Sequence, residues 1–234
     1  MTDFAYVGTE LNLFADATTW KSYVRSHLRP YLTGEVLEVG AGIGAATTAF
    51  NDGTARRWVC LEPDRALAER ISPGLPEKLA NCEVVVGSLA DFTPEERFDC
   101  VLYMDVLEHI EADGPEVARA ATHLKPNGAL AVLSPALAWL FTPFDAAIGH
   151  YRRYSKKSLR SIAPPGVREA KCVYLDSAGL LASMGNKLFL RSPTPSAAQI
   201  RFWDRFMVPI SRITDPLVGY GVGRSILMVW RKDA

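Results

Sequence analysis

The chain has 234 residues, in which 26 lysine and arginine residues balance 26 aspartate and glutamate residues. This length suits one full α/β domain, so we expect a single domain over residues 1–234. The balanced charge excludes the basic surface by which proteins bind nucleic acid phosphates. Composition therefore favours chemistry on a small molecule without a nucleic acid partner, and it leaves a homodimer open.

The sequence carries no sign of a metal site, a disulfide frame or a membrane span. Its four cysteines form no CxxC pair, and most lie in apolar runs, so we expect reduced core thiols. The N-terminus lacks the basic and apolar regions of a signal peptide. The longest apolar stretch, residues 129–141, is interrupted by Ser134 and Pro135 and is shorter than the roughly 20 residues of a span. We expect a cytoplasmic protein without a transmembrane segment.

An amphipathic helix is predicted ahead of the first strand. Apolar residues recur at helical spacing from Phe14 to Tyr31, and Pro30 marks where the pattern should stop, so the predicted helix covers residues 14–31. Trp20 and Tyr23 lie on this helix. They either pack in the core, as most aromatic residues at this spacing do, or close over a bound cofactor.

Short runs rich in Val, Leu and Cys then alternate with helical or turn-like segments. Several runs are apolar on both sides of the pleat, which is typical of a parallel sheet covered by helices on both faces. The alternation predicts an α/β fold with a doubly wound, mostly parallel, seven-stranded sheet. The predicted strands are EVLEV, RWVCLE, CEVVVG, FDCVLYM, GALAVLS, VREAKCVYL and RSILMVWRK.

Residues 187–223, between the last two predicted strands, have a different character. The segment contains four prolines, Trp203 and several Phe and Arg residues, without a clean period. We interpret it as a helical insertion that covers the same domain. A substrate lid, a dimer interface and contact with a lipid surface are alternatives that apolar area alone does not separate.

The stretch VLEVGAGIGAAT, residues 36–47, leads from an apolar strand through three glycines into a predicted helix. Such a turn presents backbone N–H groups at the carboxyl edge of a sheet. Gly40, Gly42 and Gly44 allow close approach of a ligand to the backbone. The spacing also fits the dinucleotide fingerprint, with Glu62 ending the next strand, so an NAD-dependent oxidoreductase is one alternative.

Glu38 favours a different ligand. A dinucleotide would place a pyrophosphate over this turn, and a carboxylate at the end of the same strand would repel it. A ligand with an ammonium and a sulfonium group would be attracted instead. Burying an acid between Leu37 and Val39 is costly unless a cationic group pairs with it, so Glu38 predicts a positively charged ligand.

The motifs in order resemble those of the class I S-adenosylmethionine-dependent methyltransferases. VLEVGAGIG, Glu62, FDCVLYMDVLEHI and LKPNGALAVLSP carry the resemblance over residues ~35 to 135. It implies the Rossmann-like fold of that family, with S-adenosylmethionine as the cofactor and S-adenosylhomocysteine as its product. The motif GHYRRY, together with LNLFADATTWKSY near the N-terminus, resembles a bacterial subgroup with largely undefined substrates.

The resemblance implies a role for each matching residue. Glu38 and the three glycines should meet the methionine part of the cofactor, and Glu62 should hold the two ribose hydroxyls. Asp105, after the fourth strand, should line the methyl-transfer pocket. Ser88 and Leu89 occupy the place where the family usually offers an acid and then an apolar residue to the adenine. Serine departs from that pattern, and Asp91 is an alternative partner for the adenine.

Candidates for acting on the acceptor follow strands four and five. Histidine titrates near neutral pH, so His150 and His109 are predicted general bases, and the sequence does not decide between them. Arginine suits an anionic acceptor, and we predict a substrate site from Tyr151, Arg153 and Tyr154. The alternative is structural, with His109 tethering a helix and the basic residues forming a solvated face.

The predicted function is methyl transfer to oxygen, nitrogen or an activated carbon of a small molecule. A second class would use the same pocket without methylation, as a cyclase or a binding module, since a fold does not fix its chemistry. The NAD-dependent oxidoreductase is the third.

Overall fold

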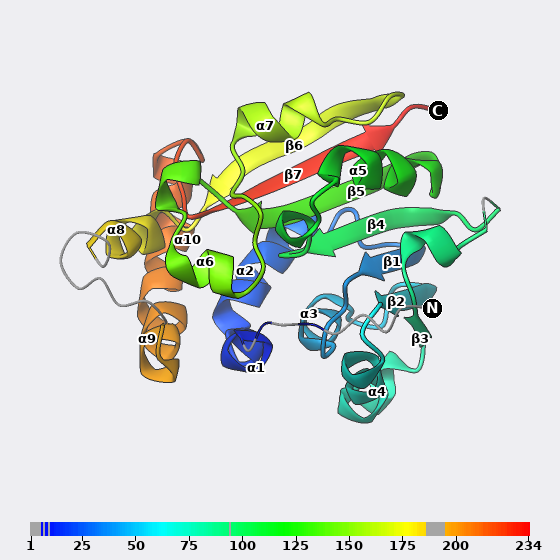
Figure 1. The fold of residues 1–234 in the computed structure, drawn as a ribbon, viewed down its shortest axis with the longest axis horizontal. Coiled ribbons are helices and arrows are strands. Elements are labelled where there is room, and N and C mark those ends of the chain that lie inside the picture. Colours follow the sequence, from blue (N-terminus) through cyan, green and yellow to red (C-terminus); the bar gives the residue numbers. More distant parts are fainter. Residues whose placement is uncertain (1–5, 7, 9, 94, 186–194) are drawn as a thin grey trace.

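A computed structural model describes residues 6, 8, 10–93, 95–185 and 195–234. Seven strands form one sheet in the order β3-β2-β1-β4-β5-β7-β6, and Figure 1 shows it running through the middle of the molecule. This confirms the predicted fold class. The strands are β1 (Glu35–Val39), β2 (Arg57–Glu62), β3 (Cys82–Val86), β4 (Phe98–Met104), β5 (Leu124–Pro135), β6 (Val167–Leu175) and β7 (Ser225–Lys232).

The sheet is parallel except at β7. Strands β1 to β5 pair in parallel, whereas β7 runs antiparallel to both β5 and β6. An antiparallel last strand begins at the edge where the parallel strands end. Ser225 therefore lies opposite Pro135, at the carboxyl edge of the sheet.

Helices cover both faces of the sheet and gather beyond its carboxyl edge, where Figure 1 shows α6 and α8 to α10. Short 3₁₀ turns, including Leu107–His109, connect several elements. The α-helices are α1 (Glu10–Ala15), α2 (Thr18–Leu28), α3 (Ala45–Phe50), α4 (Arg65–Gly74), α5 (Asp113–Thr122), α6 (Pro143–Ala147), α7 (Lys156–Ser161), α8 (Ser177–Gly185), α9 (Ala197–Phe202) and α10 (Val208–Leu217).

Two apolar layers hold the sheet between these helices. On one face Val24 and Leu28 of α2 pack with Trp58 of β2. On the other face Val117 of α5 and Leu159 of α7 pack with residues of β4, β5 and β7. Burial on both faces explains the nearly continuous apolar strands of the sequence.

The single helix predicted over residues 14–31 is two helices. The chain breaks at Asp16 and Ala17, and α2 begins at Thr18. The Asp204 carboxylate accepts hydrogen bonds from the backbone N–H groups of Thr19 (3.1 Å) and Trp20 (2.7 Å), so it caps α2 from a distant part of the chain. A cap from a distant part of the chain leaves no local sequence signal, which is why periodicity misplaced the boundary.

The described part of the predicted insertion is one long helix. A π-helical turn, Trp203–Met207, joins α9 to α10. Residues 187–194 of the predicted cover lie outside the described residues. The buried Asp215 carboxylate on α10 accepts hydrogen bonds from the Tyr23 hydroxyl (2.9 Å) and from the backbone N–H groups of Asp176 (2.8 Å) and Ser177 (2.9 Å). This carboxylate joins α10, α2 and the start of α8.

Substituting Asp215 with alanine is expected to lower the free energy of unfolding by about 3 kcal/mol, because three buried donors lose their acceptor. Urea denaturation measures the change. Asp52→Ala is the control, since Asp52 pairs with Arg25 near the surface and should cost less than about 1 kcal/mol. Equal losses in the two variants would contradict the role given to Asp215.

Candidate active site

A cavity of about 1320 Å³ lies at the carboxyl edge of the sheet. The loops after β1, β2 and β4 form one side of it, and residues of α2, α6 and α9 form the other. Ligands of doubly wound folds bind at this edge. The volume exceeds that of an ordinary single-ligand pocket, so the cavity has room for a cofactor and an acceptor together.

The glycine loop shapes the floor of the cavity. Gly40 and Gly42 line it, and both have positive φ angles, +70° and +58°. A Cβ atom at Gly40 would lie 2.7 Å from a methyl carbon of Val106, so only glycine fits beneath the loop after β4. Gly44 does not line the cavity. It precedes α3 with φ +77°, and a Cβ atom there would meet Ile71, so its role is packing of α3 against α4 and not contact with the cofactor as predicted.

Glu38 lines the cavity and is 1 % exposed. Its Oε2 atom accepts hydrogen bonds from the Thr47 hydroxyl (2.7 Å) and from the Trp58 indole N–H (2.8 Å). Burial raises the pKa of Glu38 to about 7, although the bonds from Thr47 and Trp58 favour the ionised form. The side chain is therefore held by two neutral donors, and a positively charged ligand would favour its ionised form further.

Glu62 holds the glycine loop in place. Its Oε2 atom accepts a hydrogen bond from the backbone N–H of Gly42 (2.7 Å), and its Oε1 atom accepts one from the backbone N–H of Asp64 (2.9 Å). Burial raises the pKa of Glu62, and these two bonds oppose that rise. Each carboxylate oxygen can accept a second bond, so Glu62 can still hold a pair of hydroxyl groups from the cavity side.

Ser88 and Leu89 both line the cavity, as predicted for the adenine end. Ser88 begins a short 3₁₀ turn, and its backbone N–H donates to the carboxylate of Asp91 (2.8 Å). Asp91 does not line the cavity, because its carboxylate is turned back onto this turn. The alternative that Asp91 meets the adenine is therefore wrong.

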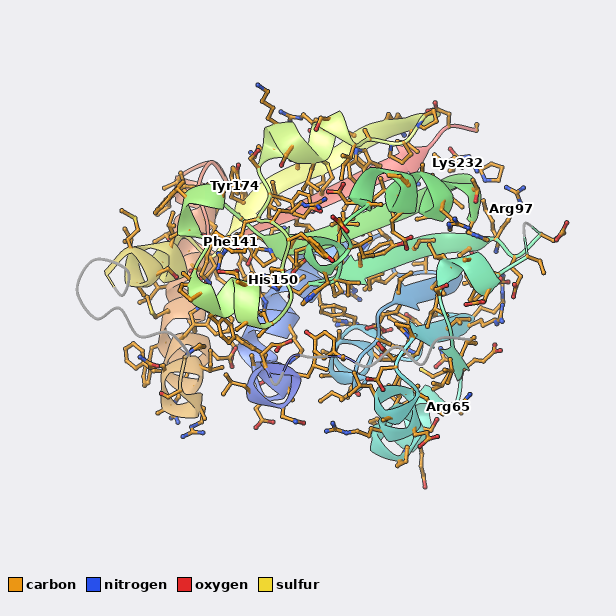
Figure 2. The ribbon with its side chains drawn as sticks, viewed as in Figure 1. Arg65, Arg97, Phe141, His150, Tyr174 and Lys232 are labelled. Atoms are coloured by element: carbon orange, nitrogen blue, oxygen red, sulfur yellow. The ribbon has the colours of Figure 1, made fainter. Side chains whose placement is uncertain are left out.

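His150 is the best positioned base in the cavity. Its Nδ1 atom lies 3.0 Å from Asp145 Oδ1, and Figure 2 labels His150 beside α6. Arg153 holds the same carboxylate through two bonds of 2.9 Å, from Nε to Oδ1 and from Nη2 to Oδ2. Asp145 also forms a capping box with Thr142 at the start of α6. Two donors of Arg153 and two of Thr142 thus hold the Asp145 carboxylate, and this carboxylate holds His150.

Two further acids face His150. Glu108 Oε1 lies 3.8 Å from His150 Nε2 and has no hydrogen-bond partner, although the residue is fully buried. Burial raises the pKa of Glu108 well above its ordinary value, and the charge of Asp105 adds to this rise. Asp105 lines the cavity, and its enclosure there raises its pKa to about 6. Glu108 therefore lies on the Nε2 side of His150, and the charge of His150 acts against the rise in the pKa of Asp105.

His109 is a weaker candidate for the base. Its ring packs edge-on against the ring of His150, with 4.5 Å between centroids. Burial and the charge of His150 lower the pKa of His109 to about 4, while a bond to the Ile148 carbonyl acts against this. An imidazole with so low a pKa is a poor proton acceptor near neutral pH.

The structure separates the other predicted residues. Trp20 lines the cavity and packs on Trp203, with 5.6 Å between ring centroids. Tyr23 does not line it, because its hydroxyl points to Asp215. Tyr154 is buried away from the cavity with its hydroxyl on Asp113, and Tyr151 is 54 % exposed at the surface. The structure therefore does not bring Tyr23, Tyr151 or Tyr154 to the cavity.

Sequence reasoning missed two cations of the cavity wall. Lys21 follows Trp20 on α2, and its Nζ atom donates to the carbonyls of Phe14 and Ala15. Arg224 immediately precedes β7 and pairs with Asp176 (3.2 Å). Arg224 could have been predicted from its position before the last strand, because an antiparallel last strand starts at the edge of the sheet where the glycine loop lies.

Within the part of the chain that the structure describes, one group of side chains could reach a metal ion. The ligand atoms of Glu108, His109 and His150 all lie within 4.8 Å of one another. Two imidazoles and a carboxylate suit a first-row transition metal or zinc. The same group contains His150, the candidate base, which lines the cavity.

Three comparisons with known proteins agree with this geometry. Residues 36–128 match the family model described as "Methyltransferase domain". A ubiquinone biosynthesis O-methyltransferase of Rhodopseudomonas palustris is 42 % identical over 45 residues, which span 19 % of this chain and 18 % of that relative. The matched residues make up less than a fifth of the length of that relative.

Solved structures share the fold over nearly the whole chain. The N-methyltransferase NodS of Bradyrhizobium japonicum, solved with S-adenosyl-L-homocysteine, has a TM-score of 0.60 at 15 % identity and covers 97 % of this chain and 93 % of its own. An S-adenosylmethionine-dependent methyltransferase of Archaeoglobus fulgidus has a TM-score of 0.57 at 16 % identity, with 91 % and 94 % covered. At these identities the likeness shows the fold.

The fold is that of the S-adenosylmethionine-dependent methyltransferases. Residues 36–128 match a methyltransferase domain, and the cofactor of this class is S-adenosylmethionine. The cavity suits that cofactor, because Gly40 and Gly42 expose the backbone of the loop to the cavity and because Glu38 and Glu62 line the same floor.

Proposed function

We propose that this protein transfers a methyl group from S-adenosylmethionine to an oxygen, nitrogen or activated carbon of a small molecule, with His150 as general base. The observation that carries the proposal is the Asp145–His150 pair in a cavity floored by the glycine loop. S-adenosylmethionine supplies an electrophilic methyl group when it is bound. The motif GHYRRY contains both His150 and Arg153, and we propose that the chain belongs to the bacterial subgroup with this motif.

His150 is held ready to accept a proton. Because its Nδ1 atom faces the Asp145 carboxylate, the assigned tautomer carries the proton on Nδ1 and leaves the lone pair of Nε2 free. An acceptor hydroxyl or amine placed beside Nε2 would lose its proton to His150, and the charge of Asp145 would stabilise the imidazolium that forms. Trp20 and Trp203 would exclude water from the donor side.

The acceptor we propose carries no fixed negative charge. Arg153, predicted to bind an anionic acceptor, is engaged on Asp145 through two bonds and therefore positions the base pair. Seven carboxyl groups line the same cavity, against the three cationic side chains of Lys21, Arg153 and Arg224. The acids are Glu10, Glu38, Glu62, Asp105, Glu108, Glu116 and Asp145. An anionic acceptor would meet repulsion there, whereas a neutral hydroxyl or an amine would not.

Incubation of the full chain with methyl-labelled S-adenosylmethionine and a panel of neutral phenols, alcohols and amines tests the proposal. We expect label in the acceptor, and the same rate after treatment with a chelator. Tight binding of the cofactor without transfer across the panel would instead indicate a non-methylating enzyme or a binding module. Loss of activity on chelation with recovery on adding zinc or manganese would place a metal on His150 and remove it as the base.

A further inference from the structure

A stripe of large apolar side chains lies exposed along the helix formed by α9, the turn Trp203–Met207 and α10. The side chains are spaced four, four, three and four residues apart, so they follow one side of the helix, and each is at least 50 % exposed. Concentrated exposure of this kind marks an interaction surface. The stripe consists of Phe202, Phe206, Ile210, Ile213 and Leu217.

The opposite side of this helix is anchored in the molecule. Trp203 and Val208 are buried in the core, and both acids of the helix point inward as well. Asp204 caps α2 through the N–H groups of its first turn, and Asp215 receives the Tyr23 hydroxyl. The stripe is therefore the outer face of a fixed helix.

All exposed charge on this helix is positive. Between residues 197 and 217 the charged side chains that remain exposed are arginines, because Asp204 and Asp215 are only 7 % and 0 % exposed. Arg205 packs over the ring of Phe206, 5.7 Å from its centroid, so charge and apolar surface lie together. We call the stripe and its arginines, Arg201, Arg205 and Arg212, the basic apolar face.

We propose that the basic apolar face docks on an anionic lipid surface. An amphipathic helix with aromatic and aliphatic residues beside arginines lies in the plane of such a surface, with its apolar side among the acyl chains and its cations on the lipid phosphates. Among the described residues no helix is long and apolar enough to cross a membrane. The mode of contact is therefore docking on the surface.

A second copy of the chain fits this face poorly. In a two-fold symmetric dimer the same patch of both copies would come together, which would bring Arg201, Arg205 and Arg212 of one copy near the arginines of the other. No exposed acid of residues 197–217 is available to pair with them. Repulsion between like charges opposes such a dimer, whereas lipid phosphates complement the arginines.

The position of the face connects docking with the cavity. Phe202 belongs to the stripe and also lines the cavity. Gln199 and Met207 of the same long helix line the cavity as well. Figure 1 shows α9 and α10 beyond the carboxyl edge of the sheet. Docking would place this side of the cavity at the lipid surface, so the acceptor would be an apolar molecule that partitions into bilayers. This last step rests on the proposed function.

Flotation with lipid vesicles tests the docking. We expect the protein to float with vesicles of phosphatidylcholine and phosphatidylglycerol but not with phosphatidylcholine alone, and to be released by high salt. Phe206→Ser/Ile213→Ser should reduce binding at least tenfold, because both substitutions remove apolar side chains that the bilayer would bury. Arg201→Gln/Arg205→Gln should act similarly. Val86→Ser and Arg160→Gln, exposed residues on β3 and α7, are matched controls and should bind as the parent does.

Two results would overturn the docking. One is that the parent protein does not float with the anionic vesicles although its unchanged melting temperature shows that it is folded. The other is a parent protein that is dimeric in sedimentation and becomes monomeric in Phe206→Ser/Ile213→Ser, since the face would then join two copies. Neither Phe206 nor Ile213 lines the cavity, so calorimetric binding of S-adenosylhomocysteine to the double variant should equal that of the parent. That arm separates failure of docking from failure of the proposed function.

Discussion

Replacing His150 with alanine is expected to lower kcat by about 100- to 1,000-fold, because general base catalysis contributes this much when the base is well placed. Cofactor affinity should change little, since His150 faces the acceptor side of the cavity. The rate with a saturating acceptor and the Kd for S-adenosylhomocysteine are the two quantities to measure.

His109→Ala is the informative comparison for His150→Ala. His109 has a pKa near 4 and a hydrogen bond to a backbone carbonyl, so its loss should reduce the rate by less than about tenfold. A larger loss of rate in His109→Ala than in His150→Ala would reverse the assignment of the base. Equal rates in His150→Ala and the parent would show that His150 is not the general base.

The second large effect is expected for Glu62→Ala, which should weaken cofactor binding by about 100-fold. Two hydrogen bonds to a charged group are worth about 3 kcal/mol together, and the alanine also releases the N–H groups of Gly42 and Asp64 that fix the loop. Calorimetric titration with S-adenosylhomocysteine measures the loss.

Glu83→Ala provides a control for the loss of a carboxylate on the neighbouring strand. Glu83 lies on β3 and pairs with Arg57 at the surface, 2.7 Å away, so its loss should leave cofactor affinity unchanged. An affinity of Glu62→Ala equal to that of Glu83→Ala would show that Glu62 neither holds the loop nor meets the ligand.

Strand patterns predicted most of the fold, because apolar runs buried on both faces leave a clear signal along the chain. The seven strands and the parallel alternation of β1 to β5 were read in this way. The break between α1 and α2 was not, because its cause is Asp204, nearly two hundred residues away. Tertiary contacts decided that boundary over local periodicity.

The candidate site, like the fold, could be predicted from the sequence only in part. Residues at the ends of strands, such as Glu38 and Glu62, and residues in the loops that follow, such as Asp105 and His150, were predicted to meet because strand ends share one edge. Tyr151 and Tyr154 were grouped with His150 because they are its neighbours in the sequence, but of that motif His150 and Arg153 reach the cavity, where both bind the Asp145 carboxylate. The orientation of Arg153 toward Asp145 depends on side-chain geometry that spacing does not contain.

The central claim is electrostatic and concerns Glu38, whose burial gives it a pKa near 7. If its carboxylate favours a positively charged donor, binding of that donor must strengthen as Glu38 ionises. Calorimetric titration of S-adenosylmethionine into the parent and into Glu38→Gln, at about pH 6 and about pH 8, measures this directly. We expect the parent to bind about tenfold more tightly at the higher pH than at the lower, and Glu38→Gln to bind weakly without this added dependence. The same pH dependence in both proteins, or binding of NAD in place of S-adenosylmethionine, would contradict the account.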